Sequence, residues 1–402
     1  IANNDLQFIE HSVNEILEGD SIEIQINIFE GKKILVEKIN IGGNTVTDES
    51  VLRSELLLDE GDPFNKLKLS QSIARLKARN LFGSVKSKIV DGANKDQKII
   101  EINVEEKPTG EISAGAGIGT NGGSFQFAVT ENNWLGKGKN VTTNLNISKE
   151  TFSGGLFVND PNYNFSGNSL NYFFNNTSND KAKAGFKNNI TSTGIGTKFE
   201  QYQNIYISPS LSLSYDDLKV NSSGSKSLKK QEGTFTDLGF SYGVTVDNRD
   251  KVYAPTDGYI SSFSQAIPLY ADSPYLRNTY EFAKYKALST EATGKFKLYA
   301  STINGLAGKD VRLSKRTGLS SKRLRGFEAG KVGPKDGEDY VGGNYAMATN
   351  FEIALPNILP ESTKTDIGMF FDVANIWHVD YDSSVLDSNK IRSTAGVNAS
   401  WL

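Results

Sequence analysis

The feature of this sequence that most limits its fold is an alternation of apolar and polar residues in segments about ten residues long. From 205 to 215 the odd positions are Ile, Ile, Pro, Leu, Leu and Tyr, whereas every even position from 208 to 214 is serine. Segments 139–147 and 235–247 repeat the pattern. Successive side chains of a strand point to opposite faces, so each segment predicts a strand with one apolar and one polar face.

The length of these segments favours a membrane-spanning barrel. A tilted strand needs about 9–11 residues to cross a bilayer, with apolar side chains outside and polar ones allowed inside. An open sheet edge cannot lie in hydrocarbon, so the strands must close on themselves. A soluble β-sandwich or barrel also alternates, but its strands are usually about five or six residues long. We therefore expect an all-β transmembrane antiparallel barrel, with a soluble β-protein as the alternative.

Fourteen segments after residue 109 fit this alternation. They lie near 111–119, 123–131, 139–148, 151–159, 168–177, 186–199, 203–217, 233–247, 258–270, 276–290, 294–307, 341–355, 363–377 and 389–402. If the first strand rises from the preceding domain, the longest connection, 308–340, lies on the external side. Long external loops and short periplasmic turns are typical of outer-membrane barrels.

Composition excludes several kinds of function. The 44 basic and 47 acidic residues give a net charge of −3, so electrostatics provide no reason to expect nucleic acid as a partner. There is no cysteine and there are two histidines, His11 and His378, which excludes disulfides, thiol catalysis and Cys/His zinc sites. The sequence has no run of about 18 apolar residues, so it predicts no membrane-spanning helix. We find no arrangement of catalytic residues and expect no enzyme.

Two further segments resemble sites but have simpler interpretations. Residues 115–123, GAGIGTNGG, are rich in glycine, but a strand rather than a helix is expected to follow them, so they do not match a nucleotide-binding loop. Asp380, Asp382 and Asp387 lie near His378, and we interpret them as a solvated acidic loop rather than a metal site. No cofactor and no metal are therefore expected.

Residues 32–108 differ from the rest and predict a small α+β domain. The expected order is a strand at 33–41 (KILVEKINI), two helices, and strands near 84–90 and 98–104. Thr47 is a candidate cap for the first helix, and apolar residues at i, i+4 and i+7 from Leu69 indicate the second. The alternating segment 21–29, SIEIQINIF, predicts the last strand of a preceding unit of the same kind, within 1–31.

The β-α-α-β-β order, with GNTVTDESVLRSELLLDEGD and SQSIARLKARNLFGSV, resembles a POTRA domain, a periplasmic module of the outer-membrane β-barrel assembly superfamily. The alternative is a generic α+β domain. Further segments are similar to the same superfamily, so the resemblance covers nearly the whole chain: ENNWLGKGKNV, VNDPNYNFSGNSL, DNRDKVYAPTDGYISSFSQA, LRGF, VGGNYAMATNFEIALP and MFFDVANIW. It implies three parts: the end of a preceding POTRA domain (1–31), a POTRA domain (32–108) and a barrel (109–402) with about 14 of 16 strands, its last strands lacking.

The resemblance also implies that the sixth external loop folds back into the barrel lumen with its Arg-Gly-Phe motif. Alternation places Glu352 and Asp372 on the lumen face of two neighbouring strands. Because an unpaired buried charge is costly, we predict that Arg325 binds both carboxylates. Gly326 would permit the tight backbone, and Phe327 would pack against the wall. The alternative is a solvated Arg325, with carboxylates that only keep the lumen polar.

The implied function is the folding and insertion of β-barrel proteins into the bacterial outer membrane, with the POTRA part in the periplasm. The implied partners are unfolded outer-membrane proteins, lipoproteins of an assembly complex and the lipid bilayer. A partner strand could add to a POTRA edge strand formed by Ser84, Val85, Lys86, Ser87, Lys88, Ile89 and Val90. The glycine-rich first barrel strand would serve as a lateral seam. Alternatives are an autotransporter assembly factor or a two-partner secretion transporter of the same superfamily and, less favoured, a passive porin.

Overall fold

The computed structural model describes residues 9–18, 21–30, 33–119, 122–164, 166–181, 185–252, 254–289, 292–337, 339–355, 365–380, 385 and 390–401. The chain divides into two compact units. The first comprises 1–111 with 130–141 and 160–166, and the second comprises 112–129, 142–159 and 167–402. Among the described residues, no helix has both the length and the apolar character needed to cross a membrane.

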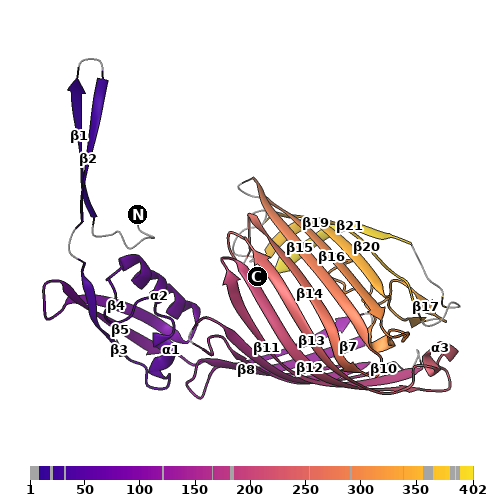
Figure 1. Ribbon diagram of the computed structural model, residues 1–402. Coiled ribbons are helices and arrows are strands. Elements are labelled where there is room, and N and C mark those ends of the chain that lie inside the picture. Colours follow the sequence, from indigo (N-terminus) through magenta and orange to yellow (C-terminus); the bar gives the residue numbers. More distant parts are fainter. Residues whose placement is uncertain are drawn as a thin grey trace. The chain divides into compact units, whose positions relative to one another are not determined.

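The first unit contains a three-stranded sheet and two helices that share one core with it (Figure 1). Its elements are β3 (Leu35–Gly42), α1 (Glu49–Arg53), α2 (Lys66–Ala78), β4 (Phe82–Asp91) and β5 (Gln97–Glu106). The strand order is β3-β5-β4, with β5 parallel to β3 and antiparallel to β4. In the described part of the chain, β4 is therefore an edge strand.

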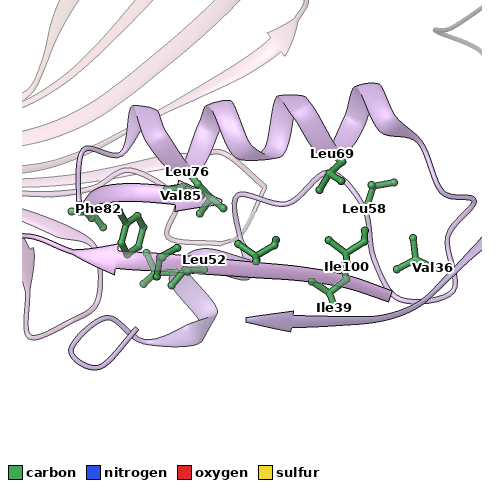
Figure 2. Close-up of a cluster of buried hydrophobic side chains, with 13 residues drawn as sticks. Val36, Ile39, Leu52, Leu58, Leu69, Leu76, Phe82, Val85 and Ile100 are labelled. Atoms are coloured by element: carbon green, nitrogen blue, oxygen red, sulfur yellow. The ribbon is translucent and has the colours of Figure 1, made fainter. Parts of the chain in front are cut away.

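The core of this unit lies between the sheet and the helices, as Figure 2 shows. Alternation along β5 buries Ile100 and Ile102, and the helical spacing of Leu69 and Leu76 brings both onto the same core. Asn65 caps α2, because its side-chain oxygen accepts hydrogen bonds from the N–H groups of residues 67 and 68 at 2.9 and 3.0 Å. Each fully buried Leu or Ile side chain contributes about 1.5–3 kcal/mol.

The prediction that Thr47 caps the first helix is wrong. The N-cap is Asp48, which makes no side-chain cap hydrogen bond, and the helix ends at Arg53. The reason is the carboxylate of Glu106 at the end of β5. It accepts hydrogen bonds from the N–H groups of Thr45, Val46 and Thr47 at 2.9, 2.9 and 2.7 Å, which fixes the turn before the helix begins.

This turn should therefore respond to acid. Burial raises the pKa of Glu106, but hydrogen bonds from Thr47, Thr45 and Val46 outweigh burial and lower the pKa from its ordinary value of 4.5 to about 2. A depressed folded-state pKa gives stability that is present above pH 4.5 and is lost as the pH falls toward 2. Amide hydrogen exchange of residues 44–48, corrected for intrinsic rates, should quicken over that interval. The effect should be absent in Glu106→Gln, and identical profiles in the two proteins would contradict it.

A separate antiparallel hairpin precedes the three-stranded sheet. It consists of β1 (Ile9–Glu18) and β2 (Ser21–Glu30). The isoleucines at 22, 24, 26 and 28 share one face of β2 and are exposed. The interpretation of this segment as the end of a preceding domain stays a prediction.

The second unit is dominated by a curved antiparallel wall (Figure 1), which confirms the predicted fold class. Within the described residues, the wall has 14 strands in sequential order from β6 to β21. They are β6 (Gly110–Gly119), β7 (Gly122–Trp134), β8 (Lys139–Ser148), β9 (Thr151–Asp160), β10 (Ser169–Lys181), β11 (Phe186–Tyr202), β12 (Ile205–Val220), β13 (Gly233–Asp247), β14 (Gly258–Ala271), β15 (Tyr275–Ser289), β16 (Ala292–Gly305), β19 (Tyr345–Leu355), β20 (Thr365–Trp377) and β21 (Arg392–Trp401).

The two faces of this wall differ in chemistry. The register of β12 with β13 pairs Leu211 with Phe240 on one face and Ser210 with Ser241 on the other. We call the first face outer, because large apolar side chains such as Leu211 and Leu213 are exposed on it. The other, inner face is hydroxylic, and the hydroxyls of Ser210 and Ser241 lie 2.7 Å apart. The predicted alternation thus separates an apolar from a polar surface.

The connections of the wall include four short elements, which lie within two long segments. The helix α3 (Lys226–Lys229) lies between β12 and β13. The segment 306–344 between β16 and β19 contains the 3-10 turn η2 (Leu313–Lys315) and the short strands β17 (Lys335–Asp336) and β18 (Asp339–Tyr340). We call segment 306–344 the inserted loop, because its side chains pack on the inner face of the wall.

Candidate functional site

The inserted loop is held against the inner face by an apolar cluster. Leu324 of the loop is 1% exposed, and Phe327 packs against the same cluster. The wall contributes Ala346 and Ala348 of β19, whose small side chains lie at alternate positions and leave room for the loop. The remaining members are Leu319, Val332, Ala374, Ile376 and the partly buried Tyr299.

Arg325 at the tip of the loop binds two carboxylates of the wall, and we call this contact the tip clamp. Its Nε and Nη2 donate to the two oxygens of Asp372 on β20 at 2.8 and 2.7 Å, which is a bidentate pair. Its Nη1 donates to Glu352 on β19 at 2.8 Å. The backbone N–H of Arg325 also donates to Asp372, at 3.0 Å. Ionised, bidentate hydrogen bonds of this kind are among the strongest in proteins.

The surroundings of the tip clamp complete its hydrogen bonding. Asp372 is fully buried and also accepts a hydrogen bond from Asn350 at 2.8 Å. Lys295 of β16 lies 3.0 Å from Glu352 and supplies a second positive charge. The guanidinium of Arg325 lies 3.8 Å from the centre of the Phe370 ring, a cation–π distance. Two carboxylates thus face two cations in this part of the inner face.

Gly326 and Phe327 follow Arg325 with distinct roles in the geometry. Gly326 has φ +80°, a left-handed conformation that side chains other than hydrogen rarely adopt. That turn directs Phe327 back toward the apolar cluster. The structure therefore brings together all five residues that sequence analysis placed around the motif, and their functional role stays a prediction.

A second ionic contact at the base of the loop was missed by sequence analysis, and we call it the base clamp. Arg312 is 5% exposed and donates to Asp216 of β12 at 3.4 Å and to Asp237 of β13. Lys315 lies 3.1 Å from Asp237. Asn188 of β11 donates to Asp216 at 2.5 Å. A usable signal existed, because both acids occupy inner-face positions of predicted strands.

Arg316 adds a third contact, which corrects the interpretation of the acidic segment after β20. Its guanidinium donates to Asn344 and to the carbonyl of Val311, each at 2.7 Å, and to Asp380 at 2.5 Å. Asp380 is therefore an ion-pair partner rather than a solvated residue. Burial raises its pKa, but the Val311 N–H and the Arg316 guanidinium more than offset burial and hold the pKa below its usual range. Asp382 and Asp387 lie outside the described residues.

The other predicted site residues lie on the edge strand of the first unit. Residues 84–90 fall within β4, which pairs with β5 on one side. Val85 is buried in the core, whereas Lys86 and Lys88 are exposed. The described residues contain no group of three or more side chains suited to hold a metal ion.

Two parts of the chain match known domain families. Residues 133–402 match the Omp85 superfamily domain. Residues 34–107 match the POTRA family, described as a surface antigen variable number repeat.

Curated proteins named outer membrane protein assembly factor BamA are similar to most of this chain. The protein from Neorickettsia risticii is 27% identical over 396 residues, covering 94% of this chain and 52% of that protein. The protein from Neisseria meningitidis serogroup B is 27% identical over 413 residues, covering 94% of this chain and 51% of that protein. The chain thus spans about half the length of these relatives.

Solved structures share the fold. BamA from Haemophilus ducreyi lacking POTRA domains 1–3 has a TM-score of 0.75 at 22% identity, covering 100% of this chain and 85% of that chain. CdiB from Escherichia coli has a TM-score of 0.59 at 13% identity, covering 99% of this chain and 75% of that chain. The likeness in fold therefore extends over all of this chain.

Removing the tip clamp should free the loop tip while the wall persists. Breaking one partner of a buried ion pair costs about 3–5 kcal/mol, so Arg325→Ala should expose residues 320–330 to limited proteolysis. Lys331→Ala is the matched control, because this exposed lysine of the same loop pairs with Glu328 within the loop. Equal cleavage of the two variants and the parent protein would show that the clamp does not hold the tip.

Removing the base clamp should loosen the first arm of the loop. In Asp216→Asn, the buried Arg312 loses an ionised partner, so amide exchange of residues 308–316 should rise and the thermal midpoint should fall. Asp217→Asn is the control, because Asp217 is the next residue of β12 and pairs with Lys219 at 3.4 Å. A control variant that loosens the arm as much as Asp216→Asn would refute the specific role of the buried pair.

Proposed function

Because this chain belongs to the Omp85 superfamily, we propose that it folds and inserts β-barrel proteins into the outer membrane of a bacterium. The proposal rests above all on the combination of a POTRA domain with a wall whose inserted loop is clamped by Arg325. Similarity to assembly factors named BamA over 94% of the chain supports it. The proposed function requires no enzymatic activity, and no cofactor takes part in the mechanism that we propose.

Client capture in this mechanism begins at β4. An edge strand has backbone N–H and C=O groups that no neighbouring strand binds, and an extended peptide can add to it by main-chain hydrogen bonds. The exposed Lys86 and Lys88 keep the edge soluble without blocking its backbone. The partners are unfolded outer-membrane proteins in the periplasm and, by resemblance, lipoproteins of a Bam-type complex.

Insertion would then take place at β6. This strand is an edge of the sheet in the described chain, and its sequence contains glycines at 110, 115, 117 and 119. Glycine-rich strands pack weakly and have a poorly specified register, so they exchange partners at low cost. A client strand that pairs with β6 satisfies its backbone groups inside the bilayer, where unpaired groups cost several kcal/mol each. The exchange of backbone hydrogen bonds between strands would therefore drive insertion without a chemical energy source.

A two-partner secretion transporter is the second candidate, because CdiB shares the fold over 99% of this chain. The fold of the BamA structure agrees better, with a TM-score of 0.75 against 0.59. The two functions differ in what they do to a client. An assembly factor leaves it inserted in the membrane, whereas a secretion transporter passes it through.

Proteoliposomes that contain the protein should accelerate the folding of a urea-unfolded outer-membrane barrel. Folding is followed by the heat-modifiable mobility of the client on a gel, and Arg325→Ala should slow it severalfold. Empty liposomes and liposomes with an unrelated barrel are the controls. Client export without insertion would favour the secretion transporter, and ion conductance without client folding would favour a porin.

Photo-crosslinking should locate the capture strand. A photoreactive residue at Lys86 on β4 should crosslink an unfolded client, because the client strand lies beside it. The matched control is Asn103, which is exposed, sits opposite Lys86 in the register and belongs to the central strand β5. Crosslinking that is equal at both positions would mean that clients bind the face of the sheet rather than its edge.

A further inference from the structure

The outer face of the wall has a groove across β15, β16, β19 and β20. Its volume is about 590 Å³, and it lies near the ends of β15 and β19 and the starts of β16 and β20. Aromatic and apolar side chains line it, namely Phe296, Phe351, Ile353, Met369 and Phe371. Lys284 and Lys286 of β15 line its side. Lys295, Glu352 and Phe370 also line the groove, although the first two pair with each other in the tip clamp and the third stacks on Arg325.

The strand register shows that these residues point outward. On the inner face, Lys295 of β16 binds Glu352 of β19, and Glu281 of β15 binds Arg323 of the inserted loop. Side chains one position away point to the opposite face. Lys284 is paired with Phe296 and Lys286 with Gly294 in the ladder of β15 and β16.

The sequence of outward side chains along β15 marks a boundary. Leu276, Asn278, Tyr280 and Phe282 precede Lys284 and Lys286 on the same face. A lysine that faces lipid costs about 2–4 kcal/mol at the bilayer midplane and about 0–1 kcal/mol near the interface. The two lysines therefore favour a position near the interface, at the level of the lipid phosphates, with Leu288 following them on the same face. This end of β15 is the end at which β6 begins, because the strands alternate in direction.

The apolar part of the groove continues into an aromatic row. Ring centroids lie 6.1 Å apart for Tyr259 and Phe282, 6.2 Å for Phe282 and Phe296, and 5.1 Å for Phe296 and Phe351. Gly294 lacks a side chain at the level of Lys286, and a Cβ there would approach Leu288 to 3.3 Å. The groove thus has apolar walls, a floor that lacks a side chain at Gly294 and is bordered by Leu288, and a cationic side.

Within the described residues, the two outward lysines of the groove have little carboxylate charge beside them. Lys286 approaches Asp257 to 3.8 Å, and both side chains are largely exposed. Among the described residues, Lys284 forms no ion pair with a carboxylate. The ammonium group of Lys284 lies at the edge of the apolar lining, so it can bind an anion that carries a hydrocarbon chain.

We propose that this groove is a binding site for one glycerophospholipid of the periplasmic leaflet. Its phosphate is held by Lys284 and Lys286, and an acyl chain lies along Phe296 and Phe351. Two cations beside one phosphate favour a lipid with a net negative headgroup over a zwitterionic one. The proposal depends on the outer-membrane placement and goes beyond client insertion, since it requires no client.

Lipid retention tests this site directly. The protein is reconstituted with equal amounts of phosphatidylglycerol and phosphatidylcholine, partly delipidated in detergent and examined by native mass spectrometry. The parent protein should retain one phosphatidylglycerol in preference to phosphatidylcholine. Each basic residue near an anionic surface contributes about fivefold in affinity, so Lys284→Gln with Lys286→Gln should weaken retention roughly 25-fold. Gly294→Leu, which fills the floor, should weaken retention of either lipid.

The matched control is Lys297→Gln. Lys297 is on β16 and is paired with Ala283, so it lies at similar depth but on the inner face. Retention should be unchanged in this variant, and heat-modifiable mobility verifies that every variant is folded. Equal retention of the two lipids, or an equal loss in Lys297→Gln, would overturn the proposal. Lipid retention without client folding activity would instead refute the proposed function and leave this site standing.

Discussion

Four arginines enter the interior of the wall on the inserted loop, and each contacts a carboxylate from outside the loop. Arg312 contacts Asp216 and Asp237, Arg316 contacts Asp380, Arg323 contacts Glu281, and Arg325 contacts Glu352 and Asp372. An uncompensated buried charge costs several kcal/mol, so the loop cannot leave without exposing the carboxylates and the guanidinium groups together. The position of the loop and the polarity of the inner face therefore depend on each other.

Alternation made the wall and the tip clamp predictable. A side-chain period of two is fixed by strand geometry, so the apolar residues that flank Glu352 and Asp372 determine where these acids point. The family resemblance then supplied Arg325 as their partner. Alternation also predicted β4 as a strand of the first unit, because a β-α-α-β-β order with buried alternate residues allows few arrangements of the strands. Strand ends were predicted to within a few residues because turns and alternation coincide there.

Contacts between distant segments were beyond reach of the sequence. Arg312 is separated by 96 residues from Asp216 and by 75 from Asp237, and nothing local in either segment indicates which loop cation meets which acid. The predicted cap of the first helix was wrong for the same reason. Its start is fixed by Glu106, 59 residues after Thr47, whereas local capping preferences favoured Thr47 itself. Local signals predict elements, and long-range partners decide their ends.

The wall is a single layer of strands, so each strand serves two environments at once. On β16, Lys295 faces the clamp while Phe296 faces the groove, and on β19, Glu352 and Phe351 divide in the same way. Deleting one residue from either strand would exchange these two sets of side chains, carrying phenylalanine inward and charge into hydrocarbon. Deleting two would restore the facing. Natural variation in these strands should therefore consist of substitutions or even-numbered length changes, with odd-numbered changes confined to the loops and turns.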